Sequence, residues 1–318
     1  MKTLSSTSNR CDLCRNDAIE FVRYSGAHLC THHFSEFFER RVKREIASQI
    51  DIGRMPVIGV ALSGGKDSSV CLYLVHKIFS RHRDAKIVAI TVNEGIKGYR
   101  DETIRAAKEL CTMLGVEHHI VSFVEFFGKT LDEIVRDRKG MACTYCGVMR
   151  RKALNIASKK TGCTVLATGL NLDDTVQSIL MNFTRGDLER LARMAPHWHL
   201  QPGLVPRILP LRSLPEREVY LYALVNKIPF SHALCPYAEF ALRNQYRRLI
   251  EMLDRENPSV KFGILKSYDE ILPLLRQRYR QKELQPCRIC GEPSIKEVCK
   301  SCELLEFGAG GHIAWPQE

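Results

Sequence analysis

Cysteines set in pairs near both ends of the chain constrain its fold more than any other feature of the sequence. Of the 13 cysteines in 318 residues, seven stand in CxxC or CxxH pairs at the two ends. Zinc prefers four tetrahedral nitrogen and sulfur ligands, and each such pair supplies two of them with little strain. The pairs combine into two quartets, which are Cys11, Cys14, Cys30 and His33, and Cys287, Cys290, Cys299 and Cys302. We therefore predict one closed structural Zn²⁺ site in each terminal module.

The spacing within the first quartet selects its fourth ligand. His28 and His32 are alternatives, but His33 follows Cys30 with the two-residue spacer typical of zinc sites. Segments this short bury little core of their own, so bound zinc contributes much of their folding free energy. We expect an amino-terminal zinc finger over residues 1–38, a large central domain over 39–284, and a carboxyl-terminal zinc ribbon and tail over 285–318.

The start of the chain and its apolar stretches indicate a cytoplasmic protein. Met1–Arg10 is polar and lacks the apolar core of a secretory signal. The longest apolar runs are too short to cross a bilayer, so no membrane association is expected. Thiols stay reduced in the cytosol, which favours metal binding over a disulfide framework.

The remaining cysteines fall into two groups. Cys71, Cys111 and Cys163 have apolar, periodic surroundings and are expected in the core. Cys143 and Cys146 form a further CxxC, and Cys235 precedes a proline in a stretch typical of a loop; these three are candidates for chemistry. From the residues alone, the CxxC could also be a zinc half-site completed by Cys163 or Cys235, or a persulfide relay.

The central part of the chain contains a phosphate-binding pattern. Pro56–Leu62 is a short apolar run typical of a buried parallel strand, Ser63–Ser68 reads SGGKDS, and Ser69–Phe79 has helical periodicity. A strand, a glycine turn and a helix start form an anion cradle, in which backbone N–H groups approach a phosphate closely. Lys66 adds a positive charge, and serine hydroxyls add donors. The pattern differs from the Walker A motif.

Further strands and helices alternate along the central domain. This alternation predicts a doubly wound α/β fold with a parallel sheet and helices on both faces. Ligands bind such sheets at the carboxyl ends of the strands, so Ser63–Ser68, Val92–Gly95 and Gly169–Asp174 are expected to line one crevice. The expected strands are Lys86–Val92, Glu117–Val124 and Cys163–Thr168, and the expected helices are Asp101–Leu114, Arg151–Lys160 and Thr175–Phe183.

Two adjacent acids, Asp173 and Asp174, precede the last of these helices. Acids at a helix start stabilise it, so one of the two is explained by capping. The other is placed to hold Mg²⁺ or to orient a nucleotide, and we assign that role to Asp174.

Taken together, these motifs resemble one family over nearly the whole chain. The terminal CxxC…CxxH, SGGKDS, CTYCGVMRR, GLNLDD, Cys235-Pro236-Tyr237 and the CxxC…CxxC tail are similar to the TtuA/NcsA group of tRNA 2-thiouridine synthetases, which are PP-loop ATP pyrophosphatases. One position departs, because Leu170 stands where the group commonly has His. The resemblance implies a 4Fe-4S cluster on Cys143, Cys146 and Cys235. It also implies an ATP site formed by Ala61, Leu62, Ser63, Gly64, Gly65, Lys66, Asp67, Ser68, Val92, Arg150, Gly169 and Asp174.

The resemblance implies a two-step transferase reaction, with Lys66, Asp67, Asp174 and the three cluster cysteines as catalytic residues. The C2 oxygen of a tRNA uridine attacks the α-phosphate of ATP and releases pyrophosphate, and sulfur then displaces AMP. CGVMRR and the stretch Ile179–Asp187 are more similar to the wobble-uridine enzymes than to the thymine-loop enzymes, which tend to carry Lys where Arg150 stands. The resemblance also implies a homodimer, with free sulfide or a ubiquitin-like thiocarboxylate protein as sulfur donor.

The charge of the chain supports a nucleic-acid partner. Lys and Arg exceed Asp and Glu by 47 − 36 = 11, and tRNA is the simplest polyanion to explain this. Another PP-loop tRNA-modifying enzyme, such as a cytidine thiolase or a lysidine synthetase, is an alternative, although terminal zinc quartets argue against it. A non-enzymatic zinc-ribbon RNA-binding protein is a second alternative, and the intact SGGKDS argues against that.

Overall fold

The computed structural model describes residues 10–50, 57–81, 84–197, 201–280 and 282–305. The predictions for residues 1–9 and for the tail over 306–318 lie outside these ranges. No described helix combines the length and the apolar composition that a bilayer crossing requires.

A five-stranded parallel sheet forms the centre of the molecule, with the order β5-β4-β3-β6-β7. The chain builds β3, β4 and β5 toward one edge and then returns to add β6 and β7 on the other side of β3. This order confirms the predicted doubly wound fold, and its switch point lies between β3 and β6. The strands are β3 (Val57–Ala61), β4 (Lys86–Asn93), β5 (Glu117–Ser122), β6 (Val165–Thr168) and β7 (Arg207–Ile208).

Helices cover both faces of the sheet, because its strands are apolar on both sides. Along β4, Ala89 belongs to the core under one face, whereas Val88 and Ile90 belong to the core under the other. The first face carries α1 (Thr31–Gln49), α2 (Lys66–Phe79), α3 (Arg100–Leu114) and α9 (Glu216–Val225). The second carries α4 (Phe123–Phe127), α5 (Leu131–Ile134) and α6 (Ala142–Lys160).

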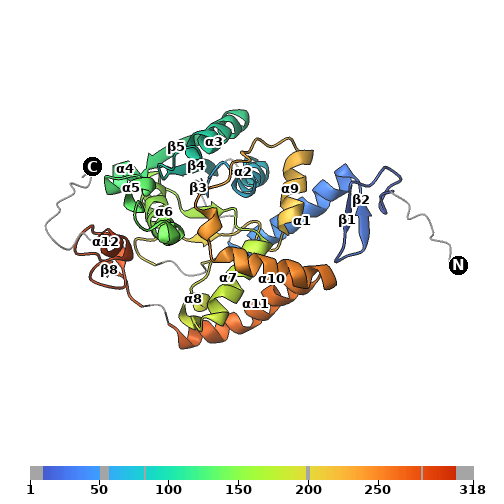
Figure 1. The fold of residues 1–318 in the computed structure, drawn as a ribbon. Helices are drawn as coiled ribbons and strands as arrows, with labels where there is room; N and C mark the ends of the chain where they lie inside the picture. The colour runs from blue at the N-terminus through green and yellow to red at the C-terminus, as the bar shows by residue number, and fades with distance from the viewer. Residues whose placement is uncertain (1–9, 51–56, 82–83, 198–200, 281, 306–318) are drawn as a thin grey trace.

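A group of helices with its own apolar core extends the domain beyond β6, and lies below the sheet in Figure 1. Leu172, Val176 and Tyr268 are buried in this core. The group contains α7 (Leu172–Thr184), α8 (Leu188–Ala192), α10 (Arg243–Glu256) and α11 (Val260–Arg278). Because α7 follows β6 directly, the group begins at the carboxyl edge of the sheet.

The two terminal modules lie at opposite ends of the molecule (Figure 1). The first is a hairpin of β1 (Glu20–Val22) and β2 (Ala27–Leu29), and α1 starts immediately after its Cys30. The second consists of β8 (Gln285–Pro286), β9 (Pro293–Ser294) and α12 (Lys300–Leu304), and it packs against α6. The described residues also include the short 3-10 helices η2 (Lys139–Met141) and η3 (Ala238–Phe240).

The structure corrects several predicted boundaries: α2 begins at Lys66 rather than Ser69, and α7 begins at Leu172 rather than Thr175. The helix expected over Arg151–Lys160 begins at Ala142, so the CTYC motif lies in its first turns. The strand expected over Glu117–Val124 ends at Ser122, because the Ser122 side chain forms a capping box with Glu125 and starts α4.

Candidate active site and metal centres

The SGGKDS loop joins β3 to α2 at the carboxyl edge of the sheet. Ser68 Oγ accepts a hydrogen bond from Ser63 N at 3.0 Å and lies 2.9 Å from Ser63 Oγ, which closes the loop on itself. Gly64 has φ +86°, and a Cβ there would lie 1.9 Å from the Thr103 carbonyl oxygen. No side chain caps the start of α2 at Gly65. The first N–H groups of α2 therefore remain available to an anion.

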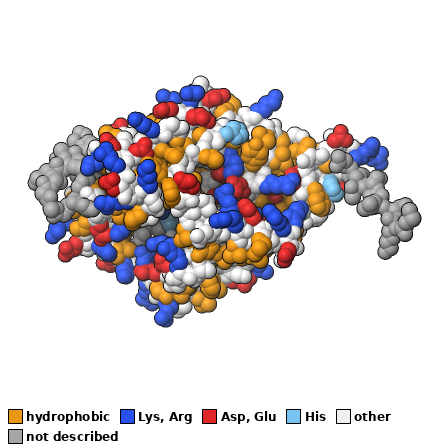
Figure 2. Space-filling view, viewed as in Figure 1, with side chains coloured by type: hydrophobic (Ala, Val, Ile, Leu, Met, Phe, Trp, Pro, Cys, Tyr) orange, Lys and Arg blue, Asp and Glu red, His pale blue; other side chains and the backbone are white. Residues whose placement is uncertain are grey.

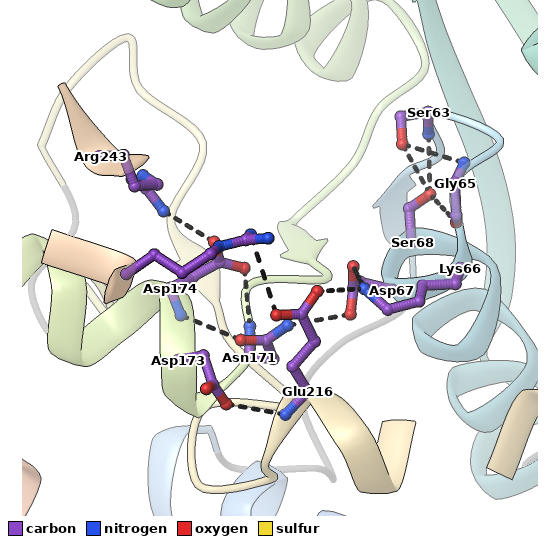
Figure 3. Close-up of polar contacts among 11 residues, drawn as sticks. Ser63, Gly65, Lys66, Asp67, Ser68, Asn171, Asp173, Asp174, Glu216 and Arg243 are labelled. Atoms are coloured by element: carbon purple, nitrogen blue, oxygen red, sulfur yellow. Dashed lines mark hydrogen bonds and ion pairs between the residues drawn. The ribbon is translucent and has the colours of Figure 1, made fainter. Parts of the chain in front are cut away.

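Lys66 lies between two carboxylates (Figure 3). Its Nζ is 2.9 Å from Asp67 Oδ2 and 2.7 Å from Glu216 Oε1 at the start of α9. Burial alone would lower the pKa of Lys66, but the charges of Asp67 and Glu216 outweigh it and raise that pKa. The same contact acts on Glu216, whose pKa is lowered by Lys66 against the opposing effect of burial. Glu216 was not predicted from the sequence, since no motif marks it.

The start of α7 reaches the loop through Asn171. Its Nδ2 donates to Asp67 Oδ1 at 2.9 Å. Gly169, two residues earlier, packs so closely on the start of α2 that a Cβ there would lie 2.6 Å from the Asp67 carbonyl oxygen. The predicted convergence of these two segments is therefore present in the structure.

The roles expected of Asp173 and Asp174 need one correction. Asn171 is the N-cap of α7, and Asp174 rather than Asp173 completes its capping box: Asn171 Oδ1 accepts from Asp174 N at 3.0 Å, and Asp174 Oδ2 lies 3.4 Å from Asn171 N. The other oxygen, Oδ1, pairs with Arg243 at 2.7 Å. Burial raises the pKa of Asp174, and Arg243 opposes this shift. Asp173 accepts from Glu216 N at 2.8 Å and pairs with Lys261 at 2.6 Å, so it fixes α9 and α11 around the crevice.

The third predicted segment, Val92–Gly95, contributes a buried carboxylate. Glu94 is 3% exposed and pairs with both Arg100 and Arg150, each at 2.8 Å. Arg100 also donates to the Val92 carbonyl oxygen at 2.6 Å. The charge of Glu94 raises the pKa of Arg150. Sequence reasoning identified Val92 and Arg150 but missed Glu94 and Arg100.

The three cysteines assigned to a cluster lie near one another beside this crevice. Cys143 and Cys146 lie in the first turns of α6, where Cys143 is exposed and Cys146 is buried. Cys235 is half-buried, and burial and the Cys143 thiolate raise its pKa. Cys143 Sγ lies 3.7 Å from the Tyr237 carbonyl oxygen, two residues after Cys235.

The segment that carries Cys235 is attached to the phosphate-binding loop. Ser231 N donates to the Gly64 carbonyl oxygen at 2.8 Å, and Ser231 forms an isolated parallel bridge with Gly65. Cys235 therefore follows, after only three intervening residues, a point fixed on the loop. By contrast, Cys163 precedes β6 at the amino edge of the sheet, which excludes it as a partner of Cys143 and Cys146.

Both predicted zinc quartets are assembled. In each, the four ligand atoms lie within 4.8 Å of one another. Cys14 Sγ and Cys30 Sγ are 3.7 Å apart, as are Cys290 Sγ and Cys299 Sγ. A tetrahedron with zinc–sulfur bonds of about 2.3 Å has edges of about 3.8 Å, so these sites fit Zn²⁺. His33 faces the sulfurs through Nδ1, at 3.3 Å from Cys11 and 3.4 Å from Cys30.

The three cluster cysteines are arranged differently. Their sulfurs do not form a group within 4.8 Å of one another, unlike those of the two quartets. A single zinc ion draws its ligands together, whereas a cubane cluster binds each cysteine to a separate iron and needs them further apart. The wider arrangement fits a cluster better than a third zinc site.

A lysine links the second quartet to the helix of the cluster cysteines. Lys152 on α6 places its Nζ 3.0 Å from Cys290 Sγ and 3.9 Å from both Cys299 and Cys302. Burial alone would lower the pKa of Lys152, but the hydrogen bond and charge of Cys290 raise it. The module is therefore held on α6 by charge as well as by packing.

Comparison with known families accounts for most of the chain. A PP-loop domain matches residues 35–252, and the amino-terminal LIM domain of 2-thiouridine synthetase TtuA matches residues 10–35. The tRNA 2-thiolation protein NcsA of Haloferax volcanii is 37% identical over 93% of this chain and 98% of its own. The tRNA-5-methyluridine(54) 2-sulfurtransferase of Pyrococcus horikoshii is 32% identical over 93% of each chain.

A solved structure agrees with these relatives. The U34-tRNA thiolase NcsA from Methanococcus maripaludis, solved with its [4Fe-4S] cluster, superimposes with a TM-score of 0.82 at 33% identity and covers 96% of this chain and 99% of its own. On the phosphate-binding loop, the paired cysteines, the fold and these matches, the chain belongs to the TtuA/NcsA family of PP-loop tRNA 2-thiolation proteins.

Proposed function

We propose that this protein is an ATP-dependent tRNA uridine 2-sulfurtransferase that acts on the wobble uridine. The proposal rests on one observation, which is that the phosphate-binding loop and the three cysteines lie at the same crevice. The SGGKDS loop and the three cysteines share this edge of the sheet, and Arg150 on α6 contacts Cys146 while pairing with the buried Glu94. Activation by ATP and sulfur transfer would thus take place side by side.

In the first step, the residues of the loop bind and orient ATP. The free N–H groups at the start of α2 and the ammonium of Lys66 face the polyphosphate and neutralise the charge that develops as the uridine C2 oxygen attacks the α-phosphate. Asp174 offers a carboxylate for Mg²⁺, which requires Arg243 to give up its 2.7 Å ion pair with that side chain. Pyrophosphate leaves, and the base then carries AMP as its leaving group.

In the second step, sulfur replaces AMP at C2. Cys143, Cys146 and Cys235 would hold the 4Fe-4S cluster, which would supply the sulfur nucleophile. Arg150, whose side chain is 46% exposed, stays close to Cys146 and faces the anionic leaving group. Burial of Cys146 keeps water away from one side of the site.

The assignment to the wobble uridine has two supports. CGVMRR carries Arg150 where the thymine-loop enzymes tend to have Lys. The solved relative with a TM-score of 0.82 is a U34-tRNA thiolase. Thiolation of uridine 54, the activity named for the Pyrococcus horikoshii relative, is the competing outcome.

The proposed partners follow from the reaction. The tRNA is the polyanion that matches the excess of 11 positive charges, and Figure 2 shows Lys and Arg side chains spread over the visible face among acidic ones. Free sulfide or a thiocarboxylate carrier protein would supply sulfur. A homodimer in the cytoplasm is consistent with the family, and several relatives are named cytoplasmic tRNA 2-thiolation proteins.

Anaerobic purification tests the metal centres. We expect about two zinc and about four iron atoms per chain, because two sites are closed quartets and the third is an open cluster. Three zinc ions without iron would contradict the cluster. Cys235→Ser should lower the iron content and abolish thiolation while zinc stays at two.

A reaction with unmodified tRNA tests the activity. Incubation with ATP and sulfide should yield AMP, pyrophosphate and 2-thiouridine, detected by mass spectrometry of nuclease fragments. A fragment with sulfur at position 34 supports the proposal, and sulfur only at position 54 contradicts the wobble assignment. A protein that binds tRNA without forming AMP is not an enzyme of this kind.

A further inference from the structure

A buried carboxylate stands between the two centres of the crevice. Glu94 follows β4 directly, and its side chain is 4% exposed. Its Oε2 lies 2.8 Å from Arg100 Nε, and its Oε1 lies 2.8 Å from Arg150 Nε. One carboxylate therefore forms ion pairs with two guanidinium groups, one from α3 and the other from α6.

The first arginine, Arg100, is hydrogen-bonded to the phosphate-binding loop. Arg100 Nη1 donates to the Ser63 carbonyl oxygen at 3.0 Å and to Thr103 Oγ1 at 2.8 Å. Its side chain is 4% exposed, so these contacts are shielded from water. The position of the Ser63 peptide, and hence of the loop, is thus transmitted to the Glu94 carboxylate.

The second arginine, Arg150, contacts one of the three cysteines. Arg150 Nη2 donates to Cys146 Sγ at 2.9 Å, while its Nε faces Glu94. This side chain is 46% exposed, and Glu94 and Cys146 are the polar groups that contact it. The orientation of Arg150 therefore depends on the carboxylate.

The backbone at Glu94 is itself fixed. Leu131 N donates to the Glu94 carbonyl oxygen at 2.7 Å. Gly95 has φ +73°, and a Cβ there would lie 2.5 Å from Thr130 Cγ2, so the chain is pressed against the start of α5. A rigid main chain makes Glu94 a firm connection between the two arginines.

We propose that Glu94 is a positioning residue that couples the nucleotide loop to the cluster cysteine Cys146 through Arg100 and Arg150. A nucleotide that shifts the Ser63 peptide moves Arg100, and the shared carboxylate passes this change to Arg150 and its bond to the sulfur. Coupling of this kind is reciprocal, so the state of the cysteine site also affects nucleotide binding. The inference rests on the proposed function and adds a link between its two steps.

The test compares Glu94→Gln with wild type in the full-length protein carrying its metals. The probe is the α,β-methylene analogue of ATP, and the readout is the reduction potential and electron paramagnetic resonance spectrum of the iron–sulfur centre. Hydrogen bonds to cluster sulfurs tune the potential, so the analogue should shift it in wild type. In Glu94→Gln we expect no shift, unchanged iron and zinc, and a 10- to 100-fold lower kcat with less than threefold change in analogue affinity.

Two further variants separate positioning from general stability. Glu218→Gln is the matched control, because Glu218 is also buried and pairs with an arginine, Arg41 of α1 at 2.6 Å, that is neither Arg100 nor Arg150. It should retain the shift. Glu94→Asp keeps the charge and the fold but is too short to reach both guanidinium groups, and it should lose most of the shift even if Glu94→Gln does not fold.

The outcomes are distinct for this inference and for the proposed function. The inference is overturned if the analogue shifts the reduction potential of Glu94→Gln or Glu94→Asp as much as that of wild type. It is also overturned if the analogue causes no shift in wild type, or if Glu218→Gln loses the shift. If wild type holds no iron, the proposed function fails, and the rate at which iodoacetamide labels Cys146 replaces the spectrum. That rate should change with the analogue in wild type and not in Glu94→Gln; equal behaviour in both overturns the coupling.

Discussion

At the scale of single residues, Lys66 shows how charge is arranged around the phosphate-binding loop. Its Nζ contacts Asp67 and Glu216, so a triphosphate that binds the loop has to compete with two carboxylates for the same ammonium. The exchange is favourable only because the phosphates also gain the N–H groups at the start of α2. The loop thus discriminates against ligands that lack several phosphate oxygens.

Replacing Lys66 by Met should reduce formation of AMP from ATP about 100- to 1,000-fold, the range for removal of one donor to a developing negative charge. Binding of tRNA should not change. The measurement is pyrophosphate release with unmodified tRNA, beside filter binding of the tRNA. Lys77→Met is the control, because Lys77 lies on the same helix and pairs with Glu39 at 2.6 Å. Equal loss in both variants would contradict a specific role for Lys66.

A half-buried histidine predicts how stability depends on pH. Burial lowers the pKa of His118 to about 4, with Lys108 and His119 adding to the effect. The folded pKa lies below the unfolded value, so the unfolded chain binds the proton first as pH falls, and stability is lost between about pH 6.5 and pH 4. The slope is at most about 1.4 kcal/mol per pH unit for one group.

His118→Gln should therefore make the fall of Tm with pH shallower over this window. Glutamine keeps a donor toward Thr91 Oγ1, which lies 2.7 Å from His118 Nε2. Calorimetry at pH 7, 6, 5 and 4.5 measures the effect. Parallel curves for variant and wild type would show that His118 does not contribute. The zinc thiolates are common to both proteins and cancel in the comparison.

At the scale of elements, the end of β6 and the start of α2 depend on close backbone contact. A Cβ on Gly169 would lie 2.6 Å from the Asp67 carbonyl oxygen and 2.8 Å from Ser68 N. These atoms are backbone and cannot turn aside, so the strand end or the helix start has to move.

Gly169→Ala should weaken ATP binding at least tenfold and lower Tm by several degrees, because the displaced atoms belong to the phosphate-binding loop. Isothermal titration with the ATP analogue measures the first effect. Gly263→Ala on α11 is the control, since a Cβ there meets nothing within 4 Å and alanine favours the helix. Unchanged affinity in Gly169→Ala would mean that ATP does not use this loop.

The difference between local patterns and long-range contacts explains which features could be predicted from the sequence. The SGGKDS turn and the zinc quartets were predictable because strand, turn, helix and ligand spacing are local patterns. The start of α6 was missed because Cys, Thr and Gly are weak helix formers and tertiary packing decides there. Glu216 reaches Lys66 across 150 residues, and Arg100 reaches Ser63 across 37, so no local pattern reveals them.

At the scale of the whole molecule, positive charge is unevenly compensated. Most described cations near the crevice pair with acids, but Arg151 and Arg207 have no acidic partner among the described residues, and Arg207 Nη2 lies 3.2 Å from the Arg151 carbonyl oxygen. Burial and the charge of Arg151 lower the pKa of Arg207 to about 10. Because α6 carries Arg151 beside the cluster cysteines, a tRNA phosphate can supply the missing counter-charge.

Arg151→Gln and Arg207→Gln should each weaken tRNA binding and reduce the slope of log affinity against log salt by about 1. The loss should be similar for tRNAs of different sequence, as expected of phosphate contacts. Fluorescence anisotropy at several salt concentrations measures both. Lys86→Gln, at the amino end of β4 and paired with Glu117 at 2.7 Å, should leave the slope unchanged. An unchanged slope in both arginine variants would remove this surface from the tRNA path.

The attachment of Ser231 to the phosphate-binding loop limits how far any reaction intermediate can travel. Ser231 N is bonded to Gly64 O, and Cys235 follows four residues later. Four residues span at most about 14 Å when fully extended. In the proposed reaction, an adenylated base formed at the loop would already lie within reach of the third cysteine. This hydrolysis-prone species would not have to dissociate, diffuse or wait for a domain movement before sulfur replaces the nucleotide.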